Sequence, residues 1–499
     1  MSKTYKPLNS AYSRVFLVRG KTRPDHVPTY APHLKMAGLS QGFGDVTVIE
    51  VPDPNNYGKF IQADSVRGAS ERATTSLSGR YPSSIKSDLR EMAADGCQHD
   101  VQLHIGSCTD PSAFNVFTKA IVLEDVVVTN YSTDDLGALE SGEQNPVNET
   151  VDLSIGKMYE VTPLSLSAKA LDVVVNEVLA GCVSDVASCG DCNTESDGCQ
   201  KIFVVTKYTG GSPATLPDIV FSLDKGITWY AHDIETLISK DPSDVAGIGD
   251  YIVVVSSDDS AMHIALKTDF ESMIDPSFTR VTSGFVGGPN AIASLGRKAF
   301  IVGDNGYIYF TDDPSSGVTV LSNGDVVSSN LICVDAIDEY TALAGGQNGA
   351  LVYTTNQTNW SETISRPVGI GVTINAVKMI NDNTWFVGCS NGKLYYTVNG
   401  GESWTEKVLP GTAPTSINAI EFSTRSIGYV SAIVSSHARI YRTFDGGQSW
   451  TVLPEGGGSI PGTPDKFNAI IACENDPNFI VAVGLADDAT DGAIVIGKN

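Results

Sequence analysis

A motif of eight residues recurs through the second part of the chain and constrains its fold more than any other feature. The strings TVNGGESW at 397–404 and TFDGGQSW at 443–450 share a Ser/Thr-x-Asp/Asn-x-Gly-x-x-Trp pattern, which SLDKGITW at 222–229 also follows. Three weaker copies begin at Thr268, Thr311 and Thr354. The Ser/Thr positions are spaced by 46, 43, 43, 43 and 46 residues. A period of this length is typical of a repeat architecture.

Each copy of the octet has the composition of a tight hairpin turn. An alternating apolar strand leads into it, as in KLYYT and RIYRT, and Asp, Asn and Gly supply the positive φ angles that such turns need. The Trp opens the next strand and can fold back over the turn. We therefore expect a structural role for Ser222, Asp224, Gly226, Trp229, Thr311, Asp313, Thr354, Asn356, Trp360, Thr397, Asn399, Trp404, Thr443, Asp445 and Trp450.

A second marker has the same period. An Asn or Asp opens an apolar strand at Asn176, Asp244, Asn290, Asp335, Asn375, Asn418 and Asn468. Together with the octet it divides each unit into four strands, and a four-stranded unit of about 40 to 45 residues is the signature of a β-propeller blade. Seven markers predict seven blades. The last unit has only three strands, so we expect MYEVTPLS at 158–165 to supply the fourth and close the ring.

The octet resembles the Asp-box of sialidase-like and photosystem-assembly-like propellers and of sortilin-type receptors, over residues 158–499. That resemblance implies a structural motif that lies away from any catalytic face. A sialidase also needs an arginine triad, whereas this region has six arginines and no Arg-Ile-Pro motif. The chain has neither an HExxH nor a GxSxG motif, so we expect no enzyme and no cofactor. A glycan hydrolase built on two carboxylates remains an alternative, because acidic residues are plentiful.

Four of the nine cysteines fall within eighteen residues of the first propeller unit. Cys182, Cys189, Cys192 and Cys199 are spaced C-x6-C-x2-C-x6-C. Two disulfides, a tetrahedral zinc on four thiolates, or reduced thiols would each suit this insert, and we favour disulfides. The other five mostly lie in apolar strands, where we expect small buried hydrophobic side chains: Cys97, Cys108, Cys333, Cys389 and Cys473.

Residues 1–157 show no propeller period. Six segments with alternating or β-branched residues are predicted to be strands, and SSIKSDLREMAADGC at 83–97 is predicted to be one amphipathic helix. The long segments 19–45 and 132–148 are predicted to be loops. The sequence thus predicts a chain dominated by β structure: an N-terminal β-sandwich or barrel with one helix, then a seven-bladed propeller over 158–499 with the insert at 182–199.

The order of elements in residues 1–157 resembles the major tail tube protein of long-tailed bacteriophages. The resemblance is carried by GFGDVTVIEVPDPNNYGKF, GASERATTSLSGRYPSSIKSDLREMA and FTKAIVLEDVVVTNYSTDDLGALESGEQNPVNETVDLSI. It implies hexameric rings that stack into a DNA conduit, with other tail or baseplate proteins as partners and no catalytic residues to transfer. Tube subunits are commonly much shorter. Here a whole propeller would decorate the exterior, where a host-surface glycan or protein is a candidate ligand.

The charge of the chain argues against specific nucleic-acid binding. The formal net charge is −25, and residues 1–155 contain 14 Lys and Arg against 19 Asp and Glu. A nucleic-acid reader needs a basic patch, whereas a weakly acidic conduit would let DNA pass without retaining it. No stretch has the 18 or so apolar residues that span a bilayer, and the N-terminus has no apolar signal run. We expect synthesis in the host cytoplasm, a place in the virion and no membrane insertion, with a receptor-binding or baseplate attachment module as the alternative function.

Overall fold

The computed structural model divides the chain into two compact units, Met1–Pro163 and Leu164–Asn499. The boundary follows residue 163 rather than residue 157. None of the helices in the described parts of the chain is long and apolar enough to cross a membrane. The structure describes residues 13–18, 29–30, 34–36, 46–52, 60–67, 73–80, 88–95, 98–105, 119–133, 148–168, 178–183, 201–206, 218–234, 242–271, 276–453, 460, 464–473, 476–485 and 492–498.

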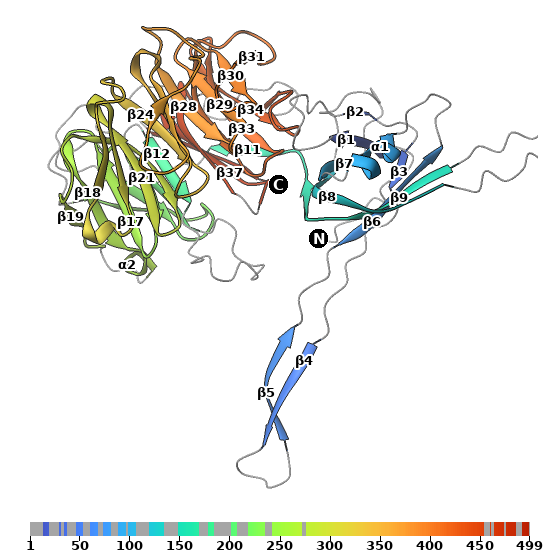
Figure 1. Ribbon diagram of the computed structural model, residues 1–499. Helices are drawn as coiled ribbons and strands as arrows, with labels where there is room; N and C mark the ends of the chain where they lie inside the picture. Colours follow the sequence, from blue (N-terminus) through green and yellow to red (C-terminus); the bar gives the residue numbers. More distant parts are fainter. Residues whose placement is uncertain are drawn as a thin grey trace, which may run out of the picture. The chain divides into compact units, whose positions relative to one another are not determined.

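Unit 1 is built on one antiparallel sheet of eight strands (Figure 1). The strand order is β2-β1-β7-β8-β9-β6-β3, and β10 also pairs with β8. Helix α1 packs on β8 and β9, and β1 lies close to β3, so the sheet curls around one core. The elements are β1 (Ser13–Val18), β2 (Thr29–Tyr30), β3 (Leu34–Met36), β6 (Thr74–Arg80), α1 (Asp88–Asp95), β7 (His99–Ile105), β8 (Lys119–Thr133), β9 (Asn148–Ser154) and β10 (Lys157–Val161).

The core of unit 1 lies between this sheet and α1. Leu89 and Met92 of the helix pack with Leu123 and other apolar side chains from β1, β6, β7, β8 and β9, all at most 2% exposed. Full burial of such a side chain stabilises the fold by about 1.5–3 kcal/mol. The predicted β-sandwich or barrel with one helix is confirmed. The loop predicted at 19–45 contains β2 and β3, because strands of two and three residues are too short to show an alternating pattern, and the rest of that segment lies outside the described residues.

A bend in β8 lets one strand serve both halves of the sheet. Residues up to Glu124 pair with β7 and β10, Val126 still pairs with His99 of β7, and residues from Val127 onward pair with β9. Asp125, at the bend, has φ of 56°. Gly156 lies opposite, and a Cβ atom there would come 2.5 Å from the Cβ of Asp125. Glycine is therefore needed where β9 passes into β10.

A separate hairpin completes unit 1. Strands β4 (Val46–Pro52) and β5 (Phe60–Arg67) pair with each other in an antiparallel two-stranded sheet. Among the described strands, neither pairs with the eight-stranded sheet. Of the two, only β4 was predicted from the sequence.

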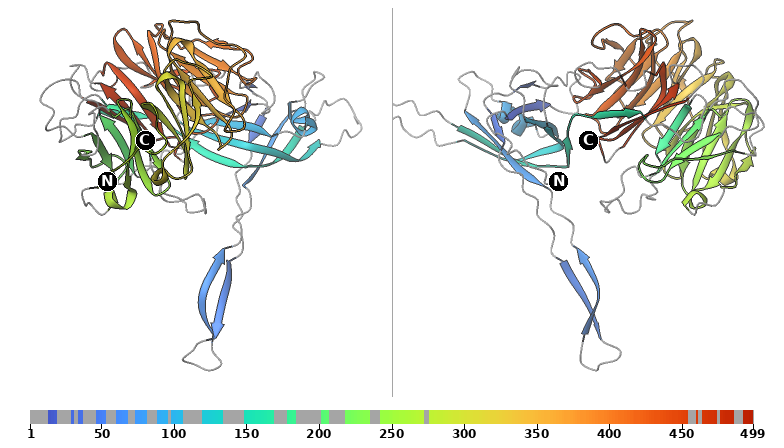
Figure 2. Two further views of the ribbon diagram at one scale, coloured as in Figure 1. Left: turned by 60° about the vertical axis from the view of Figure 1, so that its left-hand side comes forward. Right: turned by 180° about the vertical axis from the view of Figure 1, so that it is seen from behind.

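Unit 2 is a ring of seven four-stranded antiparallel sheets, which confirms the predicted seven-bladed propeller (Figure 2). The first strands of neighbouring blades contact one another around the whole ring, from β12 through β16, β20, β24, β28, β32 and β36 back to β12. Blade 1 contains β12 (Val178–Val183), β13 (Ile202–Thr206), β14 (Ile219–Ser222) and β15 (Tyr230–His232). Blade 2 contains β16 (Asp244–Ile248), β17 (Tyr251–Ser256), β18 (Asp259–Leu266), α2 (Lys267–Glu271) and β19 (Thr279–Val281).

The next four blades repeat this meander. Blade 3 contains β20 (Pro289–Leu295), β21 (Lys298–Gly303), β22 (Tyr307–Thr311) and β23 (Thr319–Asn323). Blade 4 contains β24 (Leu331–Ala336), β25 (Ala342–Gly346), β26 (Leu351–Thr354) and β27 (Ser361–Glu362). Blade 5 contains β28 (Ile374–Met379), β29 (Trp385–Cys389), β30 (Leu394–Thr397) and β31 (Thr405–Lys407). Blade 6 contains β32 (Ser416–Phe422), β33 (Gly428–Val434), β34 (His437–Thr443) and β35 (Thr451–Leu453).

Blade 7 combines the two ends of unit 2. Its strands β36 (Lys466–Ala472), β37 (Ile480–Leu485) and β38 (Gly492–Lys498) are joined by β11 (Ser165–Ala168), which pairs with β38. The predicted closure by an earlier segment is therefore correct, but the predicted segment, Met158–Ser165, was misplaced. Residues 158–161 continue β9 along β8 and so belong to the sheet of unit 1.

Candidate functional site in the propeller

The octet forms a turn whose polar side chains satisfy its own backbone. In the copy at 443–450, Thr443 Oγ1 donates to Asp445 Oδ1 at 2.8 Å and accepts from the Gly447 N–H at 2.8 Å. Asp445 also accepts from the backbone N–H and the hydroxyl of Ser449, at 2.9 and 2.6 Å. Gly447 has φ of 83°, a conformation that favours glycine. The carboxylate is saturated by donors of the turn, so it acts as a turn former.

The same bonds recur in the other strong copies. In the turn at 222–229, the Ser222 hydroxyl donates to Asp224 and accepts from the Gly226 N–H. In the turn at 397–404, Thr397 donates to the side-chain oxygen of Asn399 at 2.8 Å. The Asn399 amide then donates to the Ser403 hydroxyl, where the other two turns have a hydroxyl donating to a carboxylate.

The weaker copies keep only part of this arrangement. Thr354 Oγ1 still donates to Asn356 Oδ1, at 3.3 Å, and Asn356 accepts from the Asn359 N–H. Asp313 instead accepts from the backbone N–H of Ser315 and caps the 3₁₀ turn Pro314–Ser316, while Thr311 donates to the Gly317 carbonyl. The sequence placed all these residues in turns, but the bonds differ where the glycine or the spacing is lost.

The Asp residues of the two strong octets that contain one have pKa values shifted in opposite directions. Burial raises the pKa of Asp445, which is only 4% exposed, and its hydrogen bonds offset this in part. Burial would also raise the pKa of Asp224, but hydrogen bonds from Thr228, Ser222 and Ile227 outweigh it and the pKa lies below its ordinary value.

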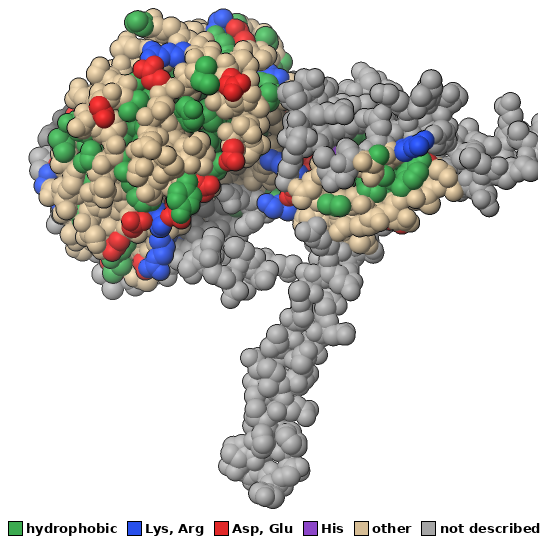
Figure 3. All heavy atoms as spheres, viewed as in Figure 1, with side chains coloured by type: hydrophobic (Ala, Val, Ile, Leu, Met, Phe, Trp, Pro, Cys, Tyr) green, Lys and Arg blue, Asp and Glu red, His purple; other side chains and the backbone are tan. Residues whose placement is uncertain are grey.

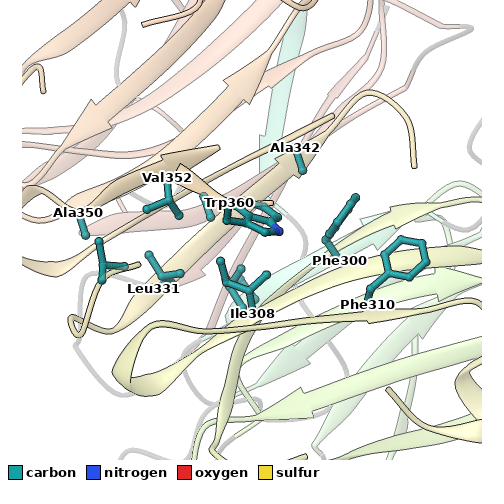
Figure 4. Close-up of a cluster of buried hydrophobic side chains, with 12 residues drawn as sticks. Phe300, Ile308, Phe310, Leu331, Ala342, Ala350, Val352 and Trp360 are labelled. Atoms are coloured by element: carbon teal, nitrogen blue, oxygen red, sulfur yellow. The ribbon is translucent and has the colours of Figure 1, made fainter. Parts of the chain in front are cut away.

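The octets of blades 4, 5 and 6 also contact the blade before their own, which the sequence did not predict. Trp360 of blade 4 packs edge-on against Phe300 of blade 3, with ring centroids 5.7 Å apart (Figure 4). Trp450 of blade 6 packs in the same way against Phe386 of blade 5. The Trp404 indole N–H donates to the carbonyl of Ser365, which follows the last strand of blade 4. Periodicity reports the pattern within a blade and carries no signal for this contact.

The second marker is the unpaired residue of a β-bulge in the first strand. The pairing register skips one residue at Asn290, Asn375, Asn418 and Asn468. A bulge leaves that residue outside the ladder. The side-chain amides of Asn290 and Asn375 donate to the carbonyls of Leu331 and Ile417 in the next blade, both at 2.9 Å. The Asn residues thus link neighbouring first strands.

One of the seven markers, Asp335, was assigned to the wrong residue. The skipped residue is Ile332 in blade 4, so Asp335 lies three positions further along β24. In blade 2, Asp244 opens β16 as predicted and accepts from the Ile292 N–H of the next blade. In blade 1 the skip falls at Leu179, and Asn176 lies outside the described residues. An acidic residue beside apolar neighbours imitates the marker when the bulge itself carries no polar side chain.

With the register known, three charged side chains form a row of ion pairs across the first strands of blades 4, 5 and 6. Lys378 of β28 lies between two carboxylates, with Nζ 3.3 Å from Asp335 Oδ1 and 2.8 Å from Glu421 Oε1. Each of the three residues is three positions beyond the bulge of its strand. Asp335 also accepts from the Met379 N–H at 2.7 Å. Aligning the blades on the Asn residues would have found Lys378 and Glu421 from the sequence.

Lys378 and its two carboxylate partners are electrostatically coupled. Burial would lower the pKa of Lys378, but attraction by Asp335 and Glu421 outweighs burial and raises it. Burial raises the pKa of Glu421, and Lys378 offsets that effect in part. In blade 2, burial raises the pKa of Asp244 to about 7, although the backbone N–H groups of Val245 and Ile292 donate to it. These groups link neighbouring blades.

Blade 2 contains the arrangement that most resembles a catalytic cluster. His263 Nε2 lies 3.0 Å from Asp259 Oδ2, and Arg280 binds both oxygens of the same carboxylate. His263 is fully buried and Asp259 is 3% exposed. Burial lowers the pKa of His263, and the hydrogen bond from Arg280 lowers the pKa of Asp259. The Arg280 side chain is 31% exposed, and its bonds to Asp259 join β19 to β18.

The described cysteines depart from the prediction at one position. Cys389 is buried and Cys333 partly buried, and both are free thiols. Burial raises the pKa of Cys389 to about 12, which makes it unreactive. Cys473 is buried as predicted, but it is disulfide-bonded.

The state of the cysteines in the insert at 182–199 stays a prediction. The side chains of Cys182, Cys189, Cys192 and Cys199 lie outside the described residues, as do Cys97 and Cys108. In the ranges that the structure describes, no group of three or more His, Cys, Asp or Glu side chains is placed to hold a metal ion.

Comparison with known proteins finds similarity at the level of solved structures. No protein-family model matches the chain, and no curated protein matches it in sequence. YCF48 bound to D1 peptide is similar with a TM-score of 0.48 and 17% identity, over 67% of this chain and 97% of that one. YCF48 from Cyanidioschyzon merolae has a TM-score of 0.49 and 13% identity, over 67% and 99%. The GH74 xyloglucanase from Xanthomonas campestris has a TM-score of 0.46 and 12% identity, over 65% and 52%. The propeller assignment rests on the strand pairing of unit 2 itself.

Proposed function

We propose that this chain is a non-catalytic virion protein, a tail tube subunit whose first unit assembles into stacked hexameric rings and whose propeller decorates the outside. The proposal rests on the resemblance of residues 1–157 to major tail tube proteins. We also assign the octets to the Asp-box class, and their shared turn geometry supports that assignment.

The hairpin of β4 and β5 is the observation that carries the proposal. An isolated two-stranded hairpin is at best marginally stable in water. This hairpin has up to eight residues in a strand, and no described strand of the same chain extends it. A neighbouring subunit would supply the missing partner. Among the described strands, β2 and β3 lie at the two edges of the main sheet, where a strand of a neighbouring subunit could add.

Charge supports passage of DNA rather than binding. Residues 1–155 hold an excess of five negative charges, and the rest of the chain an excess of twenty. The face of the propeller drawn in Figure 3 carries acidic and basic side chains in scattered small groups and no extended basic patch. Such a subunit would let DNA pass without specific contacts.

The alternative is a receptor-binding or baseplate attachment module. It is favoured by exposed apolar side chains in segments that connect successive blades: Ile370 is 86% exposed, Ile364 75% and Val286 62%. Copy number separates the two functions. A tube subunit should rival the capsid protein in abundance in purified virions, whereas an attachment protein should be scarce.

The assembly of unit 1 tests the tube directly. We expect a fragment of residues 1–163, which keeps β10 on β8, to form rings or tubes at high concentration. A matched fragment in which residues 46–67 are replaced by a short Gly-Ser turn should keep its far-ultraviolet circular dichroism but remain monomeric. A 1–163 fragment that stays monomeric at millimolar concentration in analytical ultracentrifugation would refute the tube.

A further inference from the structure

We propose that the end of blades 3 to 5 opposite the octets binds an uncharged glycan. In a meander of four antiparallel strands, the turn between the second and third strands lies at the same end as the segment that leads to the next blade. The octets connect the third and fourth strands, so they lie at the other end. We call the first end the amide face, and it consists of the turns 304–306, 347–349 and 390–393 with the connecting segments 324–330, 363–373 and 408–415. All of these residues are described.

The amide face is a packed layer of turns and connecting segments. A Cβ atom on Gly306 would come 1.7 Å from the carbonyl oxygen of Val327, so the turn of blade 3 lies directly against the segment that follows its blade. The turn of blade 4 is bonded to the segment before its blade, since the Gln347 N–H donates to the Asn330 carbonyl at 2.9 Å. A surface held in this way is pre-organised and loses little conformational entropy when a ligand binds.

An exposed amide side chain occupies the same position in three successive turns. Asn305, Asn348 and Asn391 are each 43 residues apart. Asn305 and Asn348 have φ of 53° and 57°, in the left-handed region that Asn tolerates better than most residues. Asn348 Nδ2 makes one long bond, of 3.4 Å to Ser329 Oγ, and Asn391 Oδ1 accepts from the Lys393 N–H at 3.3 Å. A side-chain amide has two donor and two acceptor positions, so much of this capacity is left for the hydroxyl groups of a ligand.

The few charged side chains of the amide face already have partners. Its two cations, Arg366 and Lys393, form ion pairs with glutamates of the outer strands. Asp304 and Asp325 accept hydrogen bonds from an amide and a hydroxyl. The opposite end of the same blades carries more charge, including Arg297, Asp312, Asp338, Glu339, Asp382 and Glu402. The described residues of the amide face thus offer no unpaired cation to an anionic ligand, and the net charge of unit 2 would repel one.

Ile370 supplies an apolar surface beside these amides. It is 86% exposed, and a Cβ atom on either of its neighbours, Gly369 and Gly371, would meet nothing within 4 Å. The turn that carries Asn348 lies close by, because a Cβ atom on Gly349 would come 3.0 Å from the Gly369 carbonyl oxygen. A sugar ring has hydroxyl groups at its edge and C–H groups on its faces. It therefore matches a surface that combines amides with an aliphatic side chain.

The composition of the amide face favours a glycan over a protein. Protein interfaces are typically anchored by aromatic and arginine side chains. Within residues 276–453, the exposed aromatic side chain is Tyr340, which lies between β24 and β25 at the octet end. Each glycan site would be weak alone, and the many copies on a decorated tube would make binding effective. In this respect the inference rests on the proposed function.

Native gel electrophoresis with dissolved polysaccharides tests the class of ligand. The full-length protein is run in gels that contain an uncharged polymer (dextran, mannan or galactan) or an anionic one (hyaluronan or alginate). We expect at least one uncharged polymer to retard the protein relative to a gel without polymer, and neither anionic polymer to do so. Retardation by an anionic polymer, or by none of these polymers, would overturn the proposal and leave Ile370 to a protein partner.

Three matched variants test the amides. The association constant for the polymer that binds should fall about 2- to 10-fold in Asn305→Gly and in Asn348→Gly, because each loses hydrogen bonds while glycine keeps the positive φ. Asn383→Gly removes an exposed amide at the octet end of blade 5 and should leave the constant unchanged. Isothermal titration calorimetry measures all three. Equal losses in the three variants, or no loss in any, would contradict the assignment of the site.

The result is separate from that of tube assembly, because electron microscopy of the same protein reports the oligomeric state. Rings that bind none of the uncharged polymers would refute this inference and keep the tube. Monomers that bind one of them would refute the tube and keep this inference.

Discussion

A single side-chain oxygen organises each octet turn. In the three strong copies, the Oδ1 atom of Asp224, Asn399 or Asp445 accepts from a hydroxyl and from a backbone N–H four residues on. Asp and Asn fill the same role because the second polar atom of the side chain meets a Ser or Thr hydroxyl, which can donate or accept. The charge of the side chain is therefore dispensable, and its shape is not.

Substitutions at Asp445 test whether the turn needs the shape of the side chain or its charge. Asp445→Ala should destabilise unit 2 by about 2–4 kcal/mol, because it leaves the buried N–H and hydroxyl donors of the turn without an acceptor. Asp445→Asn should change stability by less than about 1 kcal/mol, since Asn399 shows that an amide fits the same turn. Urea unfolding measures both values.

The pH dependence of these variants has a definite sign. Because the folded-state pKa of Asp445 is raised, the native wild type takes up a proton before the unfolded chain does as pH falls. Wild type should therefore gain stability relative to Asp445→Asn as pH falls from 7 through that pKa. An equal stability loss for the Ala and Asn variants at pH 7 would show that the charge, and not the shape, matters.

Comparing substitutions at two glycines distinguishes the cost of backbone strain from the cost of a clash between blades. Gly447 and Gly411 have φ of 83° and 89°, so Ala costs a similar strain of about 1 kcal/mol at each. A Cβ at residue 447 would come 2.4 Å from Phe386 of the preceding blade, whereas one at residue 411 would meet nothing within 4 Å. We expect Gly447→Ala to cost about 1–3 kcal/mol more than Gly411→Ala in urea unfolding. Equal costs would mean that the octet does not clamp the neighbouring blade.

At the scale of elements, the first strands form the structural ring of the propeller. They contact one another in sequence around all seven blades, and polar side chains at or near their bulges link successive strands. Lys378 adds two ion pairs, one with Asp335 and one with Glu421, and each pair crosses one blade interface.

Removing the positive charge of Lys378 tests the electrostatic coupling between Lys378 and its two carboxylate partners. We expect Lys378→Met to destabilise unit 2 by about 2–4 kcal/mol at pH 7, because two partly buried carboxylates lose their counter-charge. The loss should shrink as pH falls, since burial raises the pKa of Glu421 and its carboxylate then takes up a proton in the native state. The neutral combination Asp335→Asn, Lys378→Met and Glu421→Gln should recover most of the stability. A pH-independent loss would contradict the electrostatic account.

Strand β11 should decide whether the propeller closes. A fragment that begins at Leu164 keeps β11, whereas one that begins at Lys169 exposes the edge of β38. Exposed strand edges favour association between chains. We expect the longer fragment to unfold in one cooperative transition and the shorter one to melt lower and to aggregate, as light scattering would record. Identical melting of the two fragments would show that β11 contributes nothing to closure.

The octets predicted the period and the turns, and the seven Asn/Asp markers predicted the number of blades, because those features depend on a pattern within each repeat. They could not predict the direction of Trp360 and Trp450, since contacts between blades leave no period in the sequence. The β-bulges were visible only where Asn marked them, so Ile332 was missed. Likewise β10 was assigned to the propeller, because residues 157–161 show strand character without showing which sheet they join.

At the scale of the whole molecule, the two units are linked by three residues. β10 ends at Val161 in the sheet of unit 1, and β11 begins at Ser165 in blade 7. A ring assembled from unit 1 would therefore carry one propeller for each subunit.

Electron microscopy of the purified full-length protein at high concentration tests the central claim of a decorated tube. The account predicts six-fold rings or stacked tubes, with one peripheral density of propeller size for each subunit. Two-lobed monomers at every concentration would contradict it and would favour an attachment module instead.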